Sequence, residues 1–365
     1  MKHRQKETSQ VKTGQDLSPQ ENLNKERPNL ENLELVVQEV KNLYQEGYVG
    51  GNWTHLAIKD PKDYMIGTST EGVKLVKGNT EIYSGKLPPD DLYLLDITYA
   101  PCTNCYFLAS RDKLYRKDIN NRPPYFYMAV KCGLRPGAFF SYSHMHKRLI
   151  VCKNGRSIGV INPKTKKVEL VMGKYFRGLI EDFKLFGKHE NRVVSVTGDG
   201  NVILYSLNFG RKRGIVSKYQ VELLLEERNE VPLCLAVCSR NEYVILETGQ
   251  DKRCTSIASR MFLFKLSEKS LVKMASLDQF EEGLGYKFCL ECLSSSGNHI
   301  LWIGLSIKKN EYFQVFHYDI ENQSLVEVVS KRVKHGEHVP CKLNSMQGKY
   351  YYTGYCGKLM CLCIF

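Results

Sequence analysis

The amino-acid sequence predicts an all-β protein, a seven-bladed β-propeller, and three observations support this prediction. From Asn52 onward, short runs of β-branched and aromatic residues alternate with Gly, Asn, Asp and Lys, without sustained helical periodicity. One phrase, in which a strand, a tight turn and a second strand follow one another, recurs along the chain. Further apolar runs precede and follow most copies of the phrase, so we expect four strands in each unit.

The seven units are spaced by roughly 40 to 60 residues, as is typical of propeller blades. Clear copies of the phrase are YFLASRDKLYRKDINN, LIVCKNGRSIGVINPKT and VVSVTGDGNVILYSLN. We expect the first strand of a unit to line a central channel, the next two to form a hairpin, and the fourth to be the outer edge. The hairpin turns are predicted at Gly72, Asp112, Gly155, Gly200, Ser259, Asn310 and Gly357.

The two ends of the chain are predicted to behave differently. Residues 1–29 are rich in Gln, Glu, Lys, Asn and Ser, and such a segment cannot bury enough apolar surface to fold, so we expect a disordered tail. The propeller then covers residues 30–365. Its last unit has only three strands, and an open ring would expose unpaired backbone. Residues 30–46, which contain ENLELVVQEVK, are therefore predicted to supply the missing strand, although alone they also fit an amphipathic helix.

Composition and charge restrict the class of protein. The chain has 365 residues, 42% apolar and 25% charged, which is ordinary for a globular protein. It has no apolar run of about 20 residues and no apolar core of a secretory signal, so no membrane insertion is expected. The 13 scattered cysteines are expected to be buried thiols of a reducing compartment, which favours the cytoplasm and leaves the nucleus and the cytoskeleton open. The net charge of +13 favours polyanionic partners.

Blade length, turn chemistry and the N-terminal closing strand make residues 31–365 resemble the WD40-like β-propeller superfamily. The matching turns are Asp199-Gly200 in TGDGNV and Asn154-Gly155 in KNGRSI. The chain departs from the family pattern, because no Trp-Asp pair ends a third strand and no Gly-His pair precedes a blade. The resemblance implies a rigid, non-catalytic scaffold that binds partners on its two flat faces.

Two C-x-x-C motifs are the closest approach to a metal site. Cys102 and Cys105 are expected in a turn, whereas Cys289 and Cys292 are expected in a strand, where residues three apart point to opposite faces. A structural zinc site needs about four converging ligands, and the two motifs belong to distant blades. We therefore expect no metal here, although the sequence alone leaves Cys102 and Cys105 open.

The sequence carries no recognisable catalytic motif. It has no G-x-S-x-G elbow, no phosphate-binding loop with its Lys, and no H-E-x-x-H helix. His144 and His146 have no nearby third ligand and are expected to form a polar turn or a surface pair. We therefore expect no catalysis and no cofactor, with a hydrolase or lyase site at the channel mouth as the weakest alternative.

Basic clusters provide the main candidate for a binding site. They fall at or after the third strands of consecutive blades, and connections of one type project from one face of a propeller. These cations would then form a basic arc that binds an anionic partner. The alternative is that they are ordinary solvated residues of exposed loops. The nine residues of this basic arc are Arg116, Lys117, Arg122, Lys164, Lys166, Lys167, Arg211, Lys212 and Arg213.

The sequence therefore favours a non-catalytic scaffold, a propeller subunit of a larger intracellular assembly whose partners are other protein subunits. The alternative is a nucleic-acid or ribonucleoprotein-binding module that uses the basic arc, which could also bind acidic protein surfaces. Single-stranded RNA would require aromatic residues among the cations. Tyr125, Phe126 and Tyr127 are the available candidates, and they fit packing between blades better.

Overall fold

The computed structural model describes 21 separate stretches of the chain, and these stretches contain β-strands and one 3-10 turn but no α-helix. No helix in them is long and apolar enough to cross a membrane. The predicted tail, residues 1–29, lies outside them. The described residues are 33–42, 53–68, 72–78, 80–85, 94–110, 113–120, 127–131, 140–153, 157–172, 180–186, 189–210, 214–222, 230–238, 243–250, 259–266, 271–276, 291–296, 299–306, 312–332, 343–353 and 358–365.

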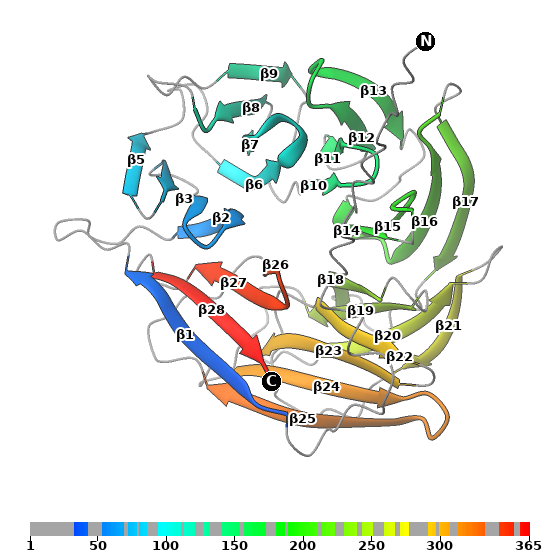
Figure 1. Ribbon diagram of the computed structural model, residues 1–365. Helices are drawn as coiled ribbons and strands as arrows, with labels where there is room; N and C mark the ends of the chain where they lie inside the picture. The colour runs from blue at the N-terminus through cyan, green and yellow to red at the C-terminus, as the bar shows by residue number, and fades with distance from the viewer. Residues whose placement is uncertain are drawn as a thin grey trace, which may run out of the picture.

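The strands form seven four-stranded antiparallel sheets arranged in a ring, so the predicted seven-bladed β-propeller is confirmed (Figure 1). In blades 1 to 6, four consecutive strands run outward from the centre, and the predicted hairpin turns fall at or beside the junctions of the second and third strands. The strands of these blades are β2 (Trp53–Asp60), β3 (Asp63–Thr68), β4 (Val73–Lys77) and β5 (Thr80–Gly85); β6 (Leu94–Ala100), β7 (Cys105–Ser110), β8 (Lys113–Asp118) and β9 (Tyr127–Lys131); β10 (Phe140–Ser143), β11 (Arg148–Lys153), β12 (Ser157–Asn162) and β13 (Lys167–Met172); β14 (Ile180–Phe186), β15 (Arg192–Thr197), β16 (Asn201–Asn208) and β17 (Gly214–Glu222); β18 (Glu230–Cys238), β19 (Tyr243–Gln250), β20 (Ser259–Leu266) and β21 (Leu271–Ser276); β22 (Glu291–Ser296), β23 (His299–Ser306), β24 (Tyr312–Asp319) and β25 (Ser324–Arg332).

Blade 7 combines strands from distant parts of the chain. Its inner strands are β26 (Asn344–Met346), β27 (Lys349–Thr353) and β28 (Lys358–Ile364), and its outer strand is β1 (Leu35–Asn42). β1 pairs antiparallel with β28, so that the blue and red strands lie side by side in Figure 1. Just before β1, Glu34 exchanges two backbone hydrogen bonds with Phe365, with N–O distances of 3.2 and 3.1 Å. Part of the range 30–46 is therefore a strand of the last blade.

Apolar side chains fill the junctions between neighbouring blades. Trp302 of blade 6 packs in one cluster with Met261 of blade 5, and Leu359 of blade 7 packs in another with Tyr64 of blade 1. Second strands such as β7 are buried along their whole length, because both faces of a blade are covered by its neighbours. The outer strand β25, in contrast, is exposed or half-buried throughout. The side chains free to meet a partner therefore lie mainly in turns and on outer strands.

Buried carboxylates tie the inner strands to their surroundings. Asp182 in β14 accepts hydrogen bonds from its neighbour Phe183 (2.7 Å) and from the amide nitrogen of Leu235 (2.9 Å) in β18 of the next blade. Asp96 holds the corresponding place in β6 and accepts from the amide nitrogen of Ile97 (2.8 Å). Both residues follow a register irregularity in a first strand. Asp182 therefore joins blade 4 to blade 5 through the backbone.

Candidate interaction surface

The part of the basic arc in blade 2 lies within β8 and serves the blade itself. Arg116 Nε donates to Cys105 Sγ (3.0 Å), and its Nη2 lies 3.7 Å from Asp118 Oδ2. Lys117 is only 1% exposed, and burial lowers the pKa of its ammonium group. Lys117 is thus wrongly placed in an exposed arc, because the side chain of a third strand is covered by the neighbouring blade. The arc residues outside the described residues are Arg122, Arg211, Lys212 and Arg213.

In blade 3, Lys164 and Lys166 lie in the turn between β12 and β13, as expected, and Lys167 is the first residue of β13. The side-chain oxygen of Asn162 accepts from the amide nitrogens of Lys164 (3.0 Å) and Thr165 (3.3 Å). The amide nitrogen of Lys166 donates to the carbonyl oxygen of Asn162 (2.8 Å). This arrangement is a self-capped turn that fixes the backbone. Lys164 and Lys167 are exposed and form no ion pair within the described part of the chain.

The turn between β10 and β11 is held by a carboxylate from blade 4. Glu190 Oε2 accepts from Ser143 Oγ (2.7 Å) and from the amide nitrogen of Met145 (3.0 Å). The amide nitrogen of His146 in turn donates to Ser143 Oγ (3.1 Å). These bonds fix the turn against the neighbouring blade.

The predicted histidine pair lies in this turn, and its two rings have different partners. His146 Nε2 donates to the carbonyl oxygen of His189 (2.7 Å), and its ring stacks on Phe209 with centroids 3.8 Å apart. His144 meets Tyr142 edge-on, with centroids 5.0 Å apart. Within the described ranges, no group of three or more His, Cys, Asp or Glu residues is arranged to hold a metal ion.

In the first C-x-x-C motif, Cys102 lies within the 3-10 turn Pro101–Thr103 and Cys105 follows the turn. Cys105 is buried at the start of β7, where its thiol lies 3.0 Å from the carbonyl oxygen of Thr103. Burial raises the pKa of this thiol, although the Arg116 guanidinium acts in the opposite direction. Cys102 is half-buried beside blade 3. A buried thiol with a raised pKa is a poor nucleophile, so its role is packing.

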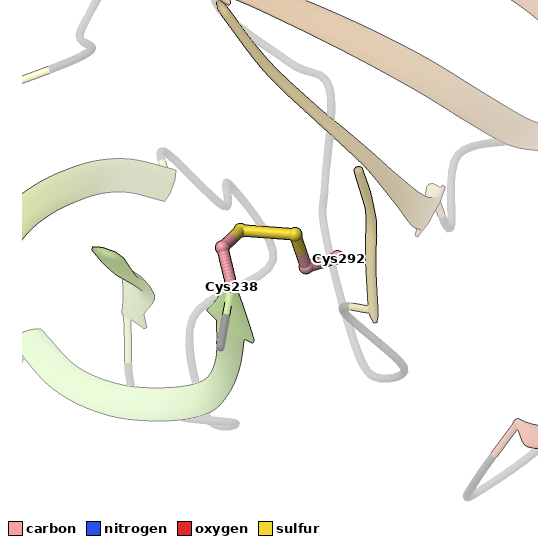
Figure 2. The surroundings of a disulfide bond; sticks show 2 residues. All are labelled: Cys238 and Cys292. Atoms are coloured by element: carbon pink, nitrogen blue, oxygen red, sulfur yellow. A yellow bond between two sulfur atoms is a disulfide. The ribbon is translucent and has the colours of Figure 1, made fainter. Parts of the chain in front are cut away.

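One cysteine of the second motif forms a disulfide, which departs from the expectation of buried thiols. Figure 2 shows Cys292 of β22 bonded to Cys238 at the end of β18, with Cα atoms 5.3 Å apart. Cys289 lies outside the described residues. The pairing arises because the first strands of blades 5 and 6 are neighbours in the ring, although the two cysteines are 54 residues apart. The disulfide therefore links adjacent blades.

A polar cluster in blade 6 includes two further histidines. His299 opens β23 opposite Asp319, and His317 lies two residues before Asp319 on β24. His317 Nε2 and His299 Nδ1 are 3.1 Å apart, and His299 Nδ1 is 3.9 Å from Asp319 Oδ2. Asp319 Oδ1 also accepts from the amide nitrogens of Glu321 (3.0 Å) and Asn322 (3.2 Å). Because a hydrogen bond between two ring nitrogens needs one without a proton, this contact requires at least one neutral ring.

We expect the free energy of unfolding to decrease as the pH falls from about 7 to about 5. Burial, and next the His299 ring, lower the pKa of His317 below its ordinary value of 6.5. A group with a depressed folded-state pKa contributes stability above its unfolded pKa, and that contribution is lost as the pH falls through the folded value.

Urea unfolding of wild type, His317→Gln and His144→Gln at several pH values checks this expectation. His317→Gln should flatten the pH dependence, whereas His144→Gln, which alters an exposed histidine of the β10–β11 turn, should preserve it. A wild-type profile that stays flat between these pH values would contradict the role of His317.

No protein-family model matches the sequence, and no curated protein matches it either.

Several residues of the surface were missed by sequence reasoning. Nothing in the sequence marks Met145, Glu190 or Phe209, because their association depends on two turns meeting across a blade junction. Among the buried carboxylates, Asp96 did leave a signal, since it stands between Leu95 and Ile97 in a first strand, whereas Asp182 follows Glu181 in IEDFK.

Proposed function

We propose that this chain is a non-catalytic interaction scaffold, a propeller subunit of a larger assembly in the cytoplasm, that binds other proteins through the turns of one face. The observation that carries the proposal is the fixation of these turns by side chains. Asn162, Glu190 and Asp319 each accept hydrogen bonds from backbone amides of a turn. Such turns need little further ordering when a partner binds, which favours affinity.

We also infer that the propeller is WD40-like. Seven four-stranded blades and an N-terminal outer strand in the last blade fit that superfamily. The Asp199-Gly200 turn, in which Thr197 Oγ1 donates to the Asp199 carboxylate, supports the same inference.

Affinity purification from the native source, at about 50 mM and about 300 mM salt, tests the scaffold function. Wild type is compared with Lys164→Glu/Lys167→Glu and with the control Lys331→Glu/Arg332→Glu, which makes the same change in charge on the exposed edge strand β25. We expect a defined set of proteins to co-purify with wild type and the control at both salt concentrations. Recovery of no stoichiometric protein at either salt concentration would reject the scaffold.

The second candidate function is binding of nucleic acid through phosphates. It is favoured by the exposed Lys164 and Lys167 and by the net charge of +13. Phosphate contacts make affinity fall steeply with salt. If this function holds, labelled single-stranded RNA should bind at low salt, and Lys164→Glu/Lys167→Glu should weaken binding and reduce its salt dependence. Equal binding by wild type and this variant would exclude the turn as a phosphate site.

A further inference from the structure

Met145 is an exposed apolar side chain in an unusual position. It is 56% exposed, although it is large and apolar. Of the other exposed large hydrophobic residues in the described part of the chain, Val40, Val168, Val272 and Val326 lie on outer strands, and Phe365 is the last residue of the chain. Met145 instead lies in a turn on the same face as the blade 3 lysines. Methionine is flexible and polarisable, and it is often used at surfaces that bind varied peptides.

The backbone that carries Met145 is held in place from the neighbouring blade. The Glu190 carboxylate accepts a hydrogen bond from the Met145 amide nitrogen at 3.0 Å. The next residue, His146, lays its ring on Phe209 of blade 4 with an interplanar angle of 19°. Phe209 is itself only half-buried. His146 and Phe209 therefore form a stacked aromatic pair across the junction of blades 3 and 4, and Met145 directly precedes this pair in the chain.

Exposed cations accompany Met145 and this aromatic pair. Lys147 is exposed in the same turn, and Lys164 and Lys167 are exposed at the other turn on this face of blade 3. Exposed lysines of this kind attract a polyanionic partner and discriminate against a basic one.

Two acidic side chains of this region are engaged within the protein. Glu169 Oε2 lies 2.6 Å from Arg148 Nε, and its Oε1 accepts from Asn162 Nδ2 (3.1 Å). Glu190 binds the β10–β11 turn. The charge of Glu169 is therefore balanced by Arg148, whereas Glu190, whose donors are neutral, keeps its negative charge beside the β10–β11 turn.

We propose that this surface is a docking site for an acidic peptide segment of a partner protein, with one aliphatic or aromatic anchor residue placed against Met145. The inference rests on the proposed scaffold function and specifies its partner. An apolar anchor explains the exposed Met145 and the neighbouring His146–Phe209 pair, which the phosphates of a nucleic acid would not need. The lysines bind the acidic residues that flank the anchor, and the fixed turn lowers the cost of ordering.

Selection of random peptides of roughly 12 residues on the immobilised full chain tests this site. We expect enrichment of sequences in which Leu, Ile, Phe or Met is flanked by Asp and Glu. For the best enriched peptide, synthesised with a fluorophore, Met145→Glu should weaken binding by about tenfold or more. Lys164→Glu/Lys167→Glu should weaken it several-fold and reduce its salt dependence, with Lys147 still present. Val326→Glu, which places the same charge at an exposed apolar residue of β25, should leave the affinity unchanged.

Three outcomes would overturn the site. The first is that the selected peptides share no acidic consensus. The second is that the peptide binds Met145→Glu as tightly as wild type. The third is that Val326→Glu loses peptide binding. Thermal unfolding of each variant establishes that its fold is retained. A different result would assign the surface to phosphates instead. In that case the peptide selection fails, Lys164→Glu/Lys167→Glu removes RNA binding, and Met145→Glu preserves it.

The failure of this site can be distinguished from failure of the scaffold function. If Met145→Glu retains the complete set of co-purifying proteins, the scaffold function stands and this docking site is wrong. If wild type itself recovers no stoichiometric protein, the scaffold function is rejected as well.

Discussion

Deletion of residues 30–46 is expected to abolish cooperative unfolding of the propeller, or to lower its Tm by more than about 15 °C. The deletion removes β1, which pairs with β28 along seven residue positions. It also removes Leu35, which is 2% exposed and packs in one cluster with Phe313 of blade 6 and Tyr352 of blade 7. Loss of β1 would expose the edge of β28 and the apolar junction of blades 6 and 7.

The size of the effect follows from the burial of β1. Truncation of one buried Leu to Ala costs about 2–5 kcal/mol, whereas a whole domain is stable by only about 5–15 kcal/mol. Leu33, Val37 and Leu35 all contribute to the same cluster. Removing these side chains together with the strand pairing therefore removes much of the total stability.

Matched variants separate the contribution of β1 packing from that of chain length. Leu35→Ala should lower the free energy of unfolding in urea by about 3 kcal/mol. Val40→Ala, at a position 40% exposed on the same strand, should lower it by less than about 1 kcal/mol. Deletion of residues 1–28 should leave Tm nearly unchanged. A 30–46 deletion that melts like the full chain would show that the ring is stable without β1.

Sequence reasoning was able to predict the blades because their determinants are local. A hairpin such as that of β15 and β16 is specified by two apolar runs and the Asp-Gly turn between them. Strand β1 was predictable by a different route, since the last unit lacks one strand and the range 30–46 resembles other fourth strands. The same range also fits a helix in isolation, so the prediction depended on the needs of the ring.

The interaction surface was less predictable because its determinants are not local. Whether a lysine is exposed depends on the blade that covers it, and Lys117 illustrates the error, whereas Lys164 lies in the exposed turn that was predicted. The fixation of Met145 depends on Glu190, which is 45 residues away. Such pairs leave no short-range pattern, and they emerge only when adjacent blades are brought together.

Reduction of the Cys238–Cys292 disulfide is expected to destabilise the protein by about 4 kcal/mol, which is the chain-entropy effect for a loop closed between cysteines 54 residues apart. The cross-link restricts the unfolded chain, and it also joins blades 5 and 6 directly. Urea unfolding with and without a phosphine reductant measures the effect. Cys238→Ala/Cys292→Ala provides the control, because reductant should destabilise wild type and leave this double variant unaffected. Equal stability of wild type in both conditions would show that the bond contributes nothing.

The same bond makes the cellular location of the chain testable, because cytosolic proteins rarely keep structural disulfides. A chain that works in the cytoplasm should hold Cys238 and Cys292 as thiols and lack this contribution to its stability. Acid quenching of the cells, then alkylation in denaturant because Cys238 is buried, and mass spectrometry of the peptides that contain Cys238 and Cys292 should then recover both cysteines alkylated. Recovery of the disulfide would instead place the chain in an oxidising compartment and contradict the expected location. In that case the cross-link would stabilise the junction of blades 5 and 6 wherever the protein operates.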